Sequence, residues 1–517
     1  MVWIIVRKEF LSNLVNFRFI AGFILCFMLS VLSAWILTQD YAERVAEYSD
    51  AVQRHKEDLY NARVYSQVKV TLDKRPEPLG LLCEGVEKYL NGTVTVEHGE
   101  TPKVMSSAGQ GNPLMAGLAS LDLSLIVQVV FSLLALLFVY DSISREREQG
   151  TLALLISNPV PRHQVLLGKY LGILLSLFVP ILFSLLAGAL IILLSPSVKL
   201  SSSDGIRLVL ISVISILYVS VFCGVGLFVS ARCSRSRTSL MLLLFLWVTF
   251  ILLIPKASEY VASYVRPVSS LDVFNERVGV LRRELSDKVN EFNEKHQPQG
   301  SSSFDSGGNA GRVFMGEKRK MMAYLERARF LEPLRIDYAD KEHLVRQEYL
   351  RELEGQSALA NNLARISPSV GYENLISALA KTDARSHLMF IERARNYRRE
   401  LISYLQSKKA LTSFLFFTRM KEEDMADGAE YWERHSKYWN EWQRQIEGGK
   451  KITQIWKDIW DEMEPLDLSD LPEFEFKGPS VLANIGYTTP DLVILVVLNL
   501  LFFMLAYVSF LRGGVKV

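Results

Sequence analysis

Residues 170–194 read YLGILLSLFVPILFSLLAGALIILL, a run of 25 residues that contains no charged side chain. An α-helix rises about 1.5 Å per residue, so about 20 apolar residues cross the roughly 30 Å hydrocarbon core of a bilayer. An apolar run of only about 10–14 residues is more typical of a helix buried inside a soluble protein. This stretch therefore predicts a membrane-spanning helix.

Five further runs of the same kind lie elsewhere in the chain, at residues 19–37, 123–140, 206–229, 239–254 and 492–510. Gln128 lies inside the second span, Arg207 at the edge of the fourth, and the fifth span is the shortest. The alternative is a set of core helices in a large soluble protein, which six such runs together disfavour. We predict an α-helical integral membrane protein with six transmembrane helices.

The composition indicates a substantial soluble part beside the spans. Of the 517 residues, 49% are hydrophobic and 22% are charged, and the mean hydropathy is +0.16. The 58 Lys and Arg residues nearly balance the 56 Asp and Glu residues, whereas a nucleic-acid-binding domain carries a basic surplus. We therefore predict no nucleic-acid partner.

The charges that flank the spans predict the orientation of the chain. The loop 195–205 holds only Lys199, while the flanks on the other side of the membrane are rich in basic residues. These are Arg7, Lys8, Arg18, Arg145, Arg147, Arg162, Lys169, Arg232, Arg235, Arg237, Arg512 and Lys516. Since Lys and Arg near span ends prefer the cytoplasm, both termini are predicted to be cytoplasmic.

This topology divides the chain into five regions. Residues 1–38 hold an interfacial helix and an uncleaved first span, and residues 39–120 form a first extracytoplasmic segment. Residues 121–255 hold spans two to five with a cytoplasmic loop at 141–169. Residues 256–488 form a mainly α-helical extracytoplasmic domain, and residues 489–517 hold the sixth span and a cytoplasmic tail.

Both extracytoplasmic segments have mostly helical periodicity, with strand-like sequence near TVTVEHGETPKV (93–104). We expect them to pack into one domain. Five tryptophans gather near its end: Trp432, Trp439, Trp442, Trp456 and Trp460. A hairpin core is the favoured interpretation, and an aromatic binding platform or a belt at the membrane interface are the alternatives.

No catalytic, cofactor-binding or metal-ligating motif is recognisable in the chain. Gly168-Lys169 and Gly449-Lys450 lack the first glycine and the hydroxyl of a P-loop, so no ATP site of that kind is predicted. Asp383 and His387 share a helix face but have no third ligand, which favours a structural pair over a metal site. The four cysteines have neither zinc-site nor redox-motif spacing.

The loop after the second span reads YDSISREREQGTLALLISNPVPRHQVLLGKYLG (140–172). Its charged half followed by an apolar half suits a short amphipathic helix at the cytoplasmic surface, with Glu146 and Glu148 presented to water or to a partner. A solvated connector is the alternative. The residues alone do not decide between the two.

This loop resembles the coupling region of type-2 ABC exporter permeases, a family with six spans and both termini in the cytoplasm. The resemblance rests on an acidic pair, Gly-Thr-Leu, a leucine pair, Pro, Arg and Gly-Lys. It implies that the loop couples the chain to an ATPase through Glu146, Glu148, Gly150, Thr151, Leu154, Leu155, Pro159 and Arg162. It also implies a separate ABC ATPase, which would carry ATP and magnesium, and a second permease copy, identical or related.

Residues 366–401 and the ending FLRGGVKV resemble a subgroup with an extra outer domain between spans five and six. This subgroup includes relatives of permeases for nitrous-oxide-reductase maturation, and the matching positions are Ser367, Pro368, Ala378, Thr382, Asp383, His387, Phe390, Tyr397 and Arg398. The segment between spans five and six, residues 256–488, is far larger than in minimal permeases. We therefore do not infer that this chain has the same substrates as those permeases.

The resemblance implies the transmembrane subunit of an ATP-driven exporter in the bacterial inner membrane, in contact with lipid. The alternative is a mechanotransmission complex, in which ATP hydrolysis moves the outer domain against an extracytoplasmic partner without bulk transport. A membrane-anchored hydrolase is disfavoured because the sequence contains no recognisable nucleophile or metal constellation.

Overall fold

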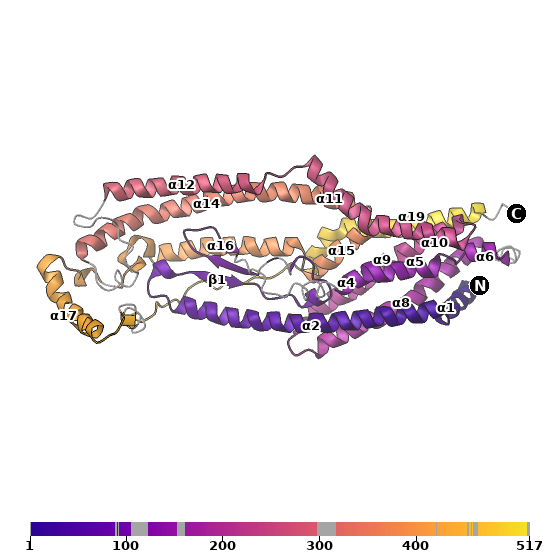
Figure 1. Cartoon of the computed structure of the whole chain (residues 1–517), viewed down its shortest axis with the longest axis horizontal. Helices are drawn as coiled ribbons and strands as arrows, with labels where there is room; N and C mark the ends of the chain where they lie inside the picture. Colours follow the sequence, from indigo (N-terminus) through magenta and orange to yellow (C-terminus); the bar gives the residue numbers. More distant parts are fainter. Residues whose placement is uncertain are drawn as a thin grey trace.

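The computed structural model describes residues 2–87, 90, 92–104, 122–151, 161–296, 317–419, 421–451, 454–455, 458 and 464–513. Within these residues six helices are long and apolar enough to cross a membrane, which confirms the predicted α-helical membrane fold. The molecule is elongated (Figure 1). Both chain termini lie at one end of the bundle of spans, which we call the terminal end, and the helix α17 (Gly428–Glu447) lies at the opposite end of the molecule.

The six spans coincide with the predicted apolar runs, although several of the helices are longer than these runs. In chain order the elements that form them are α2 (Phe17–Tyr60), α4–η4–α5 (Leu123–Leu125, Ile126–Phe131 and Ser132–Val139), α8 (Arg162–Leu194), α9 (Ser202–Arg232), α10–η5–α11 (Ser236–Val248, Thr249–Leu253 and Ile254–Val265) and α19 (Val481–Gly513). The helix α1 (Val2–Leu14) precedes them and α6 (Ser144–Glu148) follows α5. A helix is therefore present before the first span, where the sequence predicts one.

The fourth span, α9, lies at the centre of the bundle and packs against α5, α8, α10 and α19. Two of its glycines allow close approach. A Cβ at Gly226 would lie 2.8 Å from the Val139 Cβ, and one at Gly224 would lie 3.1 Å from the Phe502 Cβ. Since apolar burial hardly drives association in lipid, such small residues favour tight helix packing. The fifth and sixth spans lie at the periphery, and most of their apolar side chains are exposed.

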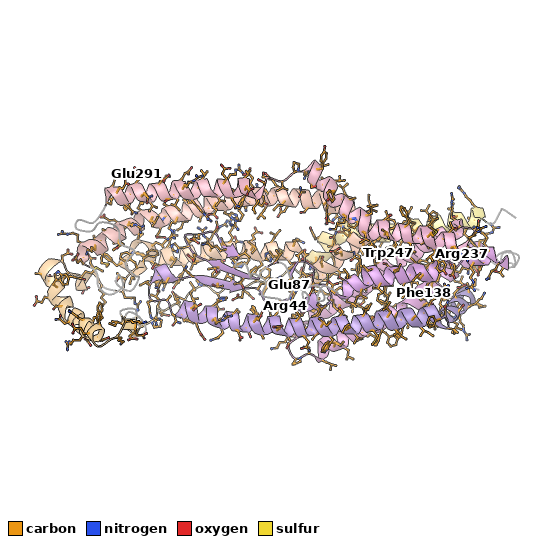
Figure 2. All side chains as sticks on the ribbon, viewed as in Figure 1. Arg44, Glu87, Phe138, Arg237, Trp247 and Glu291 are labelled. Atoms are coloured by element: carbon orange, nitrogen blue, oxygen red, sulfur yellow. The ribbon has the colours of Figure 1, made fainter. Side chains whose placement is uncertain are left out.

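Two spans contain a π-helical turn, in η4 and in η5. These turns leave carbonyl groups that neighbouring helices satisfy. The Tyr218 hydroxyl donates to the Gln128 carbonyl at 2.8 Å, and the hydroxyls of Ser367 and Ser369 donate to the Phe250 carbonyl. Trp247, labelled in Figure 2, donates from its indole nitrogen to the Ser132 hydroxyl at 2.9 Å and joins the two spans directly.

Beyond the bundle the chain forms what we call the distal domain, built from the described residues within 41–104, 266–366 and 381–478. Its helices are the outer half of α2, α12 (Leu271–Lys295), α14 (Lys318–Ala364), α16 (Ala384–Ser407) and α17. A small antiparallel sheet has the order β1 (Val70–Asp73), β2 (Thr93–Val96), β3 (Lys103–Val104), with Val70 opposite Val96. The short helical turns are η1 (Tyr65–Gln67), η2 (Pro78–Leu81), η6 (Ala410–Thr412), η7 (Phe414–Phe416) and η8 (Glu422–Asp424). Of these, η2 packs into the core of the bundle.

The hydrophobic core of the distal domain lies between the sheet, α14 and α16, and it is separate from the core of the bundle. The predicted strand-like segment is therefore correct, and it holds β2 and β3. The single helix α14 runs for 47 residues through Pro333. Residues 368–407 form two helices rather than one, because Lys381 adopts a left-handed conformation with φ of 61°.

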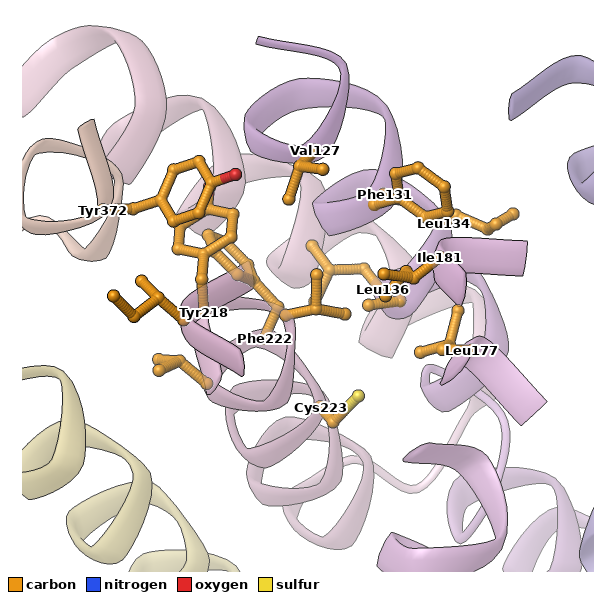
Figure 3. Packing of buried hydrophobic residues seen from close by; sticks show 14 of the residues in the cluster. Val127, Phe131, Leu134, Leu136, Leu177, Ile181, Tyr218, Phe222, Cys223 and Tyr372 are labelled. Atoms are coloured by element: carbon orange, nitrogen blue, oxygen red, sulfur yellow. The ribbon is translucent and has the colours of Figure 1, made fainter. Parts of the chain in front are cut away.

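The first of these two helices, α15 (Pro368–Ala380), packs into the core of the bundle rather than into the core of the distal domain. Its Tyr372 ring stacks on Tyr218 of α9, with ring centroids 4.5 Å apart (Figure 3). The buried Arg207 guanidinium donates to the carbonyls of Leu379 (2.8 Å) and Pro479 (2.7 Å). Arg207 therefore satisfies one carbonyl group at the C-terminal end of α15 and one just before α19.

A buried ion pair also joins the distal domain to the sixth span. The Arg365 guanidinium donates to both carboxylate oxygens of Asp491, at 2.9 and 3.2 Å. The Asn374 side chain donates to the same carboxylate at 3.2 Å. The Asp491 side chain is 2% exposed, so this pair and α15 form a rigid junction between the two parts of the molecule.

The tryptophan-rich segment does not form the predicted hairpin core at its described positions. Trp432 is 58% exposed on α17, and Trp442 is only partly buried. The side chains of Trp439, Trp456 and Trp460 lie outside the described residues. A belt at the membrane interface is also wrong for α17, since this helix lies at the end of the molecule farthest from the spans (Figure 1).

Candidate functional site

The predicted coupling loop begins with the short helix α6 at the terminal end of the bundle. Gly150 follows it with φ of +74°, a left-handed conformation that glycine adopts at low cost. The Thr151 hydroxyl donates to the Glu146 carbonyl at 3.2 Å and closes the turn. Leu154, Leu155 and Pro159 lie outside the described residues. Arg162 is the first residue of α8 and donates to the Leu511 carbonyl at the end of the sixth span, at 3.1 Å.

Glu146 is bound within the chain, to the ammonium group of Lys169. The Lys169 side chain is only 2% exposed and donates to Glu146 Oε1 at 2.7 Å, Glu9 Oε1 at 3.0 Å and the Ser142 carbonyl at 3.0 Å. One buried cation therefore holds α1, the loop and α8 together. In the described part of the chain the second oxygen of Glu146, Oε2, is buried and has no hydrogen-bond partner.

Two glycines of α8 bring α1 close enough for this contact. A Cβ at Gly168 would lie 2.8 Å from the Ile5 Cβ, and one at Gly172 would lie 2.7 Å from the Glu9 Cβ. Both distances are too short for any side chain to fit without movement of the backbone. The glycine in the predicted Gly-Lys pattern thus places Glu9 beside Lys169.

The next two residues of the loop bind the neighbouring ends of the fourth and fifth spans. Arg147 donates to the carbonyls of Ala231 (2.9 Å) and Cys233 (3.2 Å) at the C-terminal end of α9. The Glu148 carboxylate accepts from the Ser236 backbone N–H (3.2 Å) and hydroxyl (3.1 Å) at the N-terminal end of α10. Each charge has the sign that the helix dipole favours at that end.

The start of the loop is bound to the first and fourth spans. The Ser230 hydroxyl of α9 accepts from the backbone N–H groups of Ile143 and Ser144, both at 3.1 Å. Arg18, near the beginning of α2, forms an ion pair with Asp141 at 3.2 Å. Together with the contacts of Lys169, Arg147 and Glu148, these bonds connect residues 141–151 to the first, third, fourth and fifth spans at the terminal end of the bundle. The loop itself follows directly from the second span.

The sequence identified the acidic pair of this site but not the partners of the two carboxylates. Glu9, Lys169 and Ser236 are distant from them in the chain, and the roles of Lys169 and Arg147 were not predicted. The one available signal was the Gly-Lys pattern, which places a lysine one residue after a glycine at a helix crossing. The predicted exposure holds for Glu148, which lies on the surface beside Gln149 and Gly150, whereas Glu146 is half-buried.

The second pair singled out in the sequence, Asp383 and His387, lies at the start of α16. Asp383 precedes α16 and its carboxylate accepts from the Ser386 hydroxyl at 2.5 Å. Burial lowers the pKa of His387, which favours its neutral form. No cluster of three potential metal ligands occurs among the residues that the structure describes.

Comparison with known proteins agrees with this architecture. The family described as "ABC-2 family transporter protein" matches residues 3–515. A segment of 51 residues is 47% identical to the probable ABC transporter permease protein NosY of Pseudomonas aeruginosa. That match covers 10% of this chain and 18% of the relative. Because the family match extends over almost the whole sequence, the chain belongs to the ABC-2 family of transporter proteins.

Proposed function

We propose that this chain is the membrane subunit of an ATP-driven exporter that couples to a separate ATPase at the terminal end of the bundle. The observation that carries the proposal is the set of bonds made by residues 141–151, which contact the ends of the first, third, fourth and fifth spans. A force applied to this short loop would act on the bundle as a whole. The family membership supports a transport role.

The ATPase would bind the exposed surface formed by Arg145, Gln149, Gly150 and Thr151, with Glu146 and Glu148 just behind it. The Arg145 side chain is 60% exposed. The carboxylate of Glu148 bonds to the first residue of α10, so movement of the loop would reach the fifth span directly. Leu154, Leu155, Pro159 and Arg162 would complete the contact, as the resemblance implies.

A coupling loop of this kind must distinguish two states of the transporter. A ligand shifts a conformational equilibrium only by its differential affinity for the two states. Two permease copies would each bind one ATPase. The two ATPases would close on each other when they bind nucleotide, and this closure would supply the difference in affinity between the two states. ATP and magnesium would lie in the ATPase partner, since the sequence of this chain contains no P-loop.

The basic flanks of the spans support an orientation with both termini in the cytoplasm of a bacterial inner membrane. Reporter domains fused after Gln149 or Arg512 are expected to be cytoplasmic, and a reporter fused after Glu447 is expected to be extracytoplasmic. A cytoplasmic reporter after Glu447 would contradict this orientation, because α17 would then lie on the same side as the termini.

A mechanotransmission complex is the second candidate, and the junction formed by α15 favours it. The buried contacts of Tyr372, Arg207 and Arg365 would pass movement of the spans to the distal domain. The continuous helix α2 links both parts as well, since its 44 residues extend about 66 Å.

Reconstitution with the cognate ATPase separates the two candidates. An exporter is expected to show ATP-dependent flux of a substrate across proteoliposomes and no ATP hydrolysis by the permease alone. A stimulated ATPase with no flux, together with ATP-dependent movement between spin labels on α14 and α19, would favour mechanotransmission. Hydrolysis by the purified permease would contradict both candidates.

A further inference from the structure

A cavity of about 620 Å³ lies in the distal domain, at the end of α2 that is farthest from the bundle (Figure 1). Its walls come from the last turn of α2, η1, the turn after β2, α14 and η7. Ser66 and Lys69 in its wall are exposed, so the cavity opens to water. A volume of this size is in the range that accommodates a small molecule.

Glu332 of α14 lines this cavity, although its side chain is only 4% exposed. One carboxylate oxygen, Oε2, lies 2.7 Å from His98 Nε2. The other oxygen, Oε1, accepts no hydrogen bond from the described residues and lies 3.6 Å from Arg335 Nη1, which is too far for one. Because an unpaired acceptor in a buried side chain lowers stability, a ligand that donates to this oxygen would stabilise the folded chain.

The charged side chains of the lining balance one another. Three acids and three bases contribute to it: Asp58, Glu97, Glu332, Lys69, Arg327 and Arg335. Glu97 forms an ion pair with Lys69 at 2.8 Å, as Glu332 does with Arg335 at the longer distance. An anion would be repelled by the carboxylates and a cation by the basic groups. An uncharged group that both donates and accepts suits such a pair, and a hydroxyl group has both capacities.

Three aromatic side chains form an apolar part of the wall: Tyr324, Phe416 and Phe417. Both phenylalanines are buried, and the Phe417 ring packs against Tyr324 with centroids 6.1 Å apart. A sugar ring carries hydroxyl groups on its edge and apolar C–H bonds on its faces, and it has no net charge. We propose that this cavity binds a neutral saccharide, with hydroxyl groups at Glu332 and Arg335 and a ring face against the aromatic side chains.

The position of the cavity favours a soluble saccharide over the headgroup of a membrane glycolipid. Tyr41 of α2 still packs in the core of the bundle, and Asp58 in the cavity wall lies 17 residues farther along the same helix. This separation corresponds to about 26 Å along the helix axis. The saccharide is therefore expected to enter from water. The proposal goes beyond the exporter function and does not depend on it.

The test uses the full chain in nanodiscs, because maltoside detergents carry a sugar headgroup of their own. Saturation-transfer NMR detects contact with three neutral disaccharides, maltose, cellobiose and N,N′-diacetylchitobiose, at millimolar concentration. At least one of them is expected to receive saturation on its ring protons. Arg335→Met removes the donor beside Glu332, so the dissociation constant of that disaccharide is expected to rise by about tenfold or more.

A second variant blocks the cavity without a change of charge. Ser66→Trp places a large side chain at an exposed position in the cavity wall and is expected to abolish the saturation transfer in a chain that still folds. The matched controls are Ser49→Trp at an exposed position of α2 and Arg351→Met at an exposed position of α14. Neither residue lines the cavity, so both variants are expected to bind the disaccharide like the wild type.

Three results would overturn the proposal. The first is the absence of saturation transfer to all three disaccharides in the wild-type chain. The second is wild-type affinity for the disaccharide in either Arg335→Met or Ser66→Trp. The third is binding of a short extended peptide that Ser66→Trp blocks, without binding of any disaccharide, because the ligand would then be a polypeptide.

Discussion

Replacement of Lys169 by methionine is expected to lower the free energy of unfolding by about 3–5 kcal/mol, the range for removal of one partner from a buried ion pair. The substitution keeps the length of the side chain but leaves Glu9 and Glu146 facing each other without their shared cation. It also leaves the Ser142 carbonyl without its donor. Unfolding of the purified chain in detergent by a denaturant provides the measurement.

Two comparisons make this result specific to the site. The matched variant Lys199→Met removes an exposed lysine from the loop at the other end of the bundle, and its effect is expected to stay within about 0.5 kcal/mol. The triple variant Lys169→Met, Glu9→Gln, Glu146→Gln is expected to recover much of the lost stability, since it removes the uncompensated charges. Wild-type stability of Lys169→Met would contradict the role of this lysine.

Replacement of Arg365 by methionine is expected to have a comparable effect at the other end of the bundle. It leaves the Asp491 carboxylate, which is 2% exposed, with only the Asn374 amide as a partner. The expected loss is about 3 kcal/mol, because the uncompensated charge is buried. In the same variant, limited proteolysis is expected to cut residues near 365 faster, since the connection between α14 and α15 loses its bond to α19.

A double-mutant cycle checks that this effect belongs to the ion pair. The double variant Arg365→Met, Asp491→Leu is expected to be more stable than Arg365→Met, with a coupling energy of about 1–3 kcal/mol. Arg277→Met breaks an exposed pair with Glu348 and is expected to change stability by less than about 1 kcal/mol. Additive effects of the two substitutions at 365 and 491 would show that the pair does not hold the junction.

Much of the membrane part could be predicted from the sequence, because the length of an apolar run is a sufficient signal for a span. The ends of the spans were harder to predict. The fifth helix continues from Ser236 to Val265 through a π-helical turn, well beyond the apolar run 239–254. Its final turns contain Lys256 and Glu259, whose charges end the apolar pattern but not the helix.

The helix α15 shows a different limit of sequence reasoning. Its 13 residues are too few to cross a bilayer, so the pattern assigned it to the extracytoplasmic helical region. Its burial depends on partners that are distant in the sequence, above all Tyr218 and Arg207 of α9. Apolar periodicity identifies a buried face but not the surface that covers it.

The same limit applies to the candidate site. The acidic pair and Gly150 were visible as a local pattern, and Gly150 adopts a positive φ directly after α6. The partner of Glu146 comes from α8, and Lys169 in turn contacts Glu9, 160 residues earlier in the chain. An ion pair between such distant residues has no local sequence pattern. The two carboxylates were therefore expected to face water or a partner, whereas both are bound within the chain.

The coupling of the ATPase to the loop 141–151 is the central claim, and ATPase stimulation measures it most directly. The variant Glu146→Ala, Glu148→Ala releases the loop from Lys169 and from Ser236. In a chain that still inserts and folds, the account predicts that stimulation of the cognate ATPase falls by about tenfold or more, within the usual range of coupling between sites. The control Glu276→Ala, Glu294→Ala removes two exposed acids of α12 and should leave stimulation unchanged. Wild-type stimulation and co-purification of the ATPase with Glu146→Ala, Glu148→Ala would contradict the account, and the loop would then be only a connector.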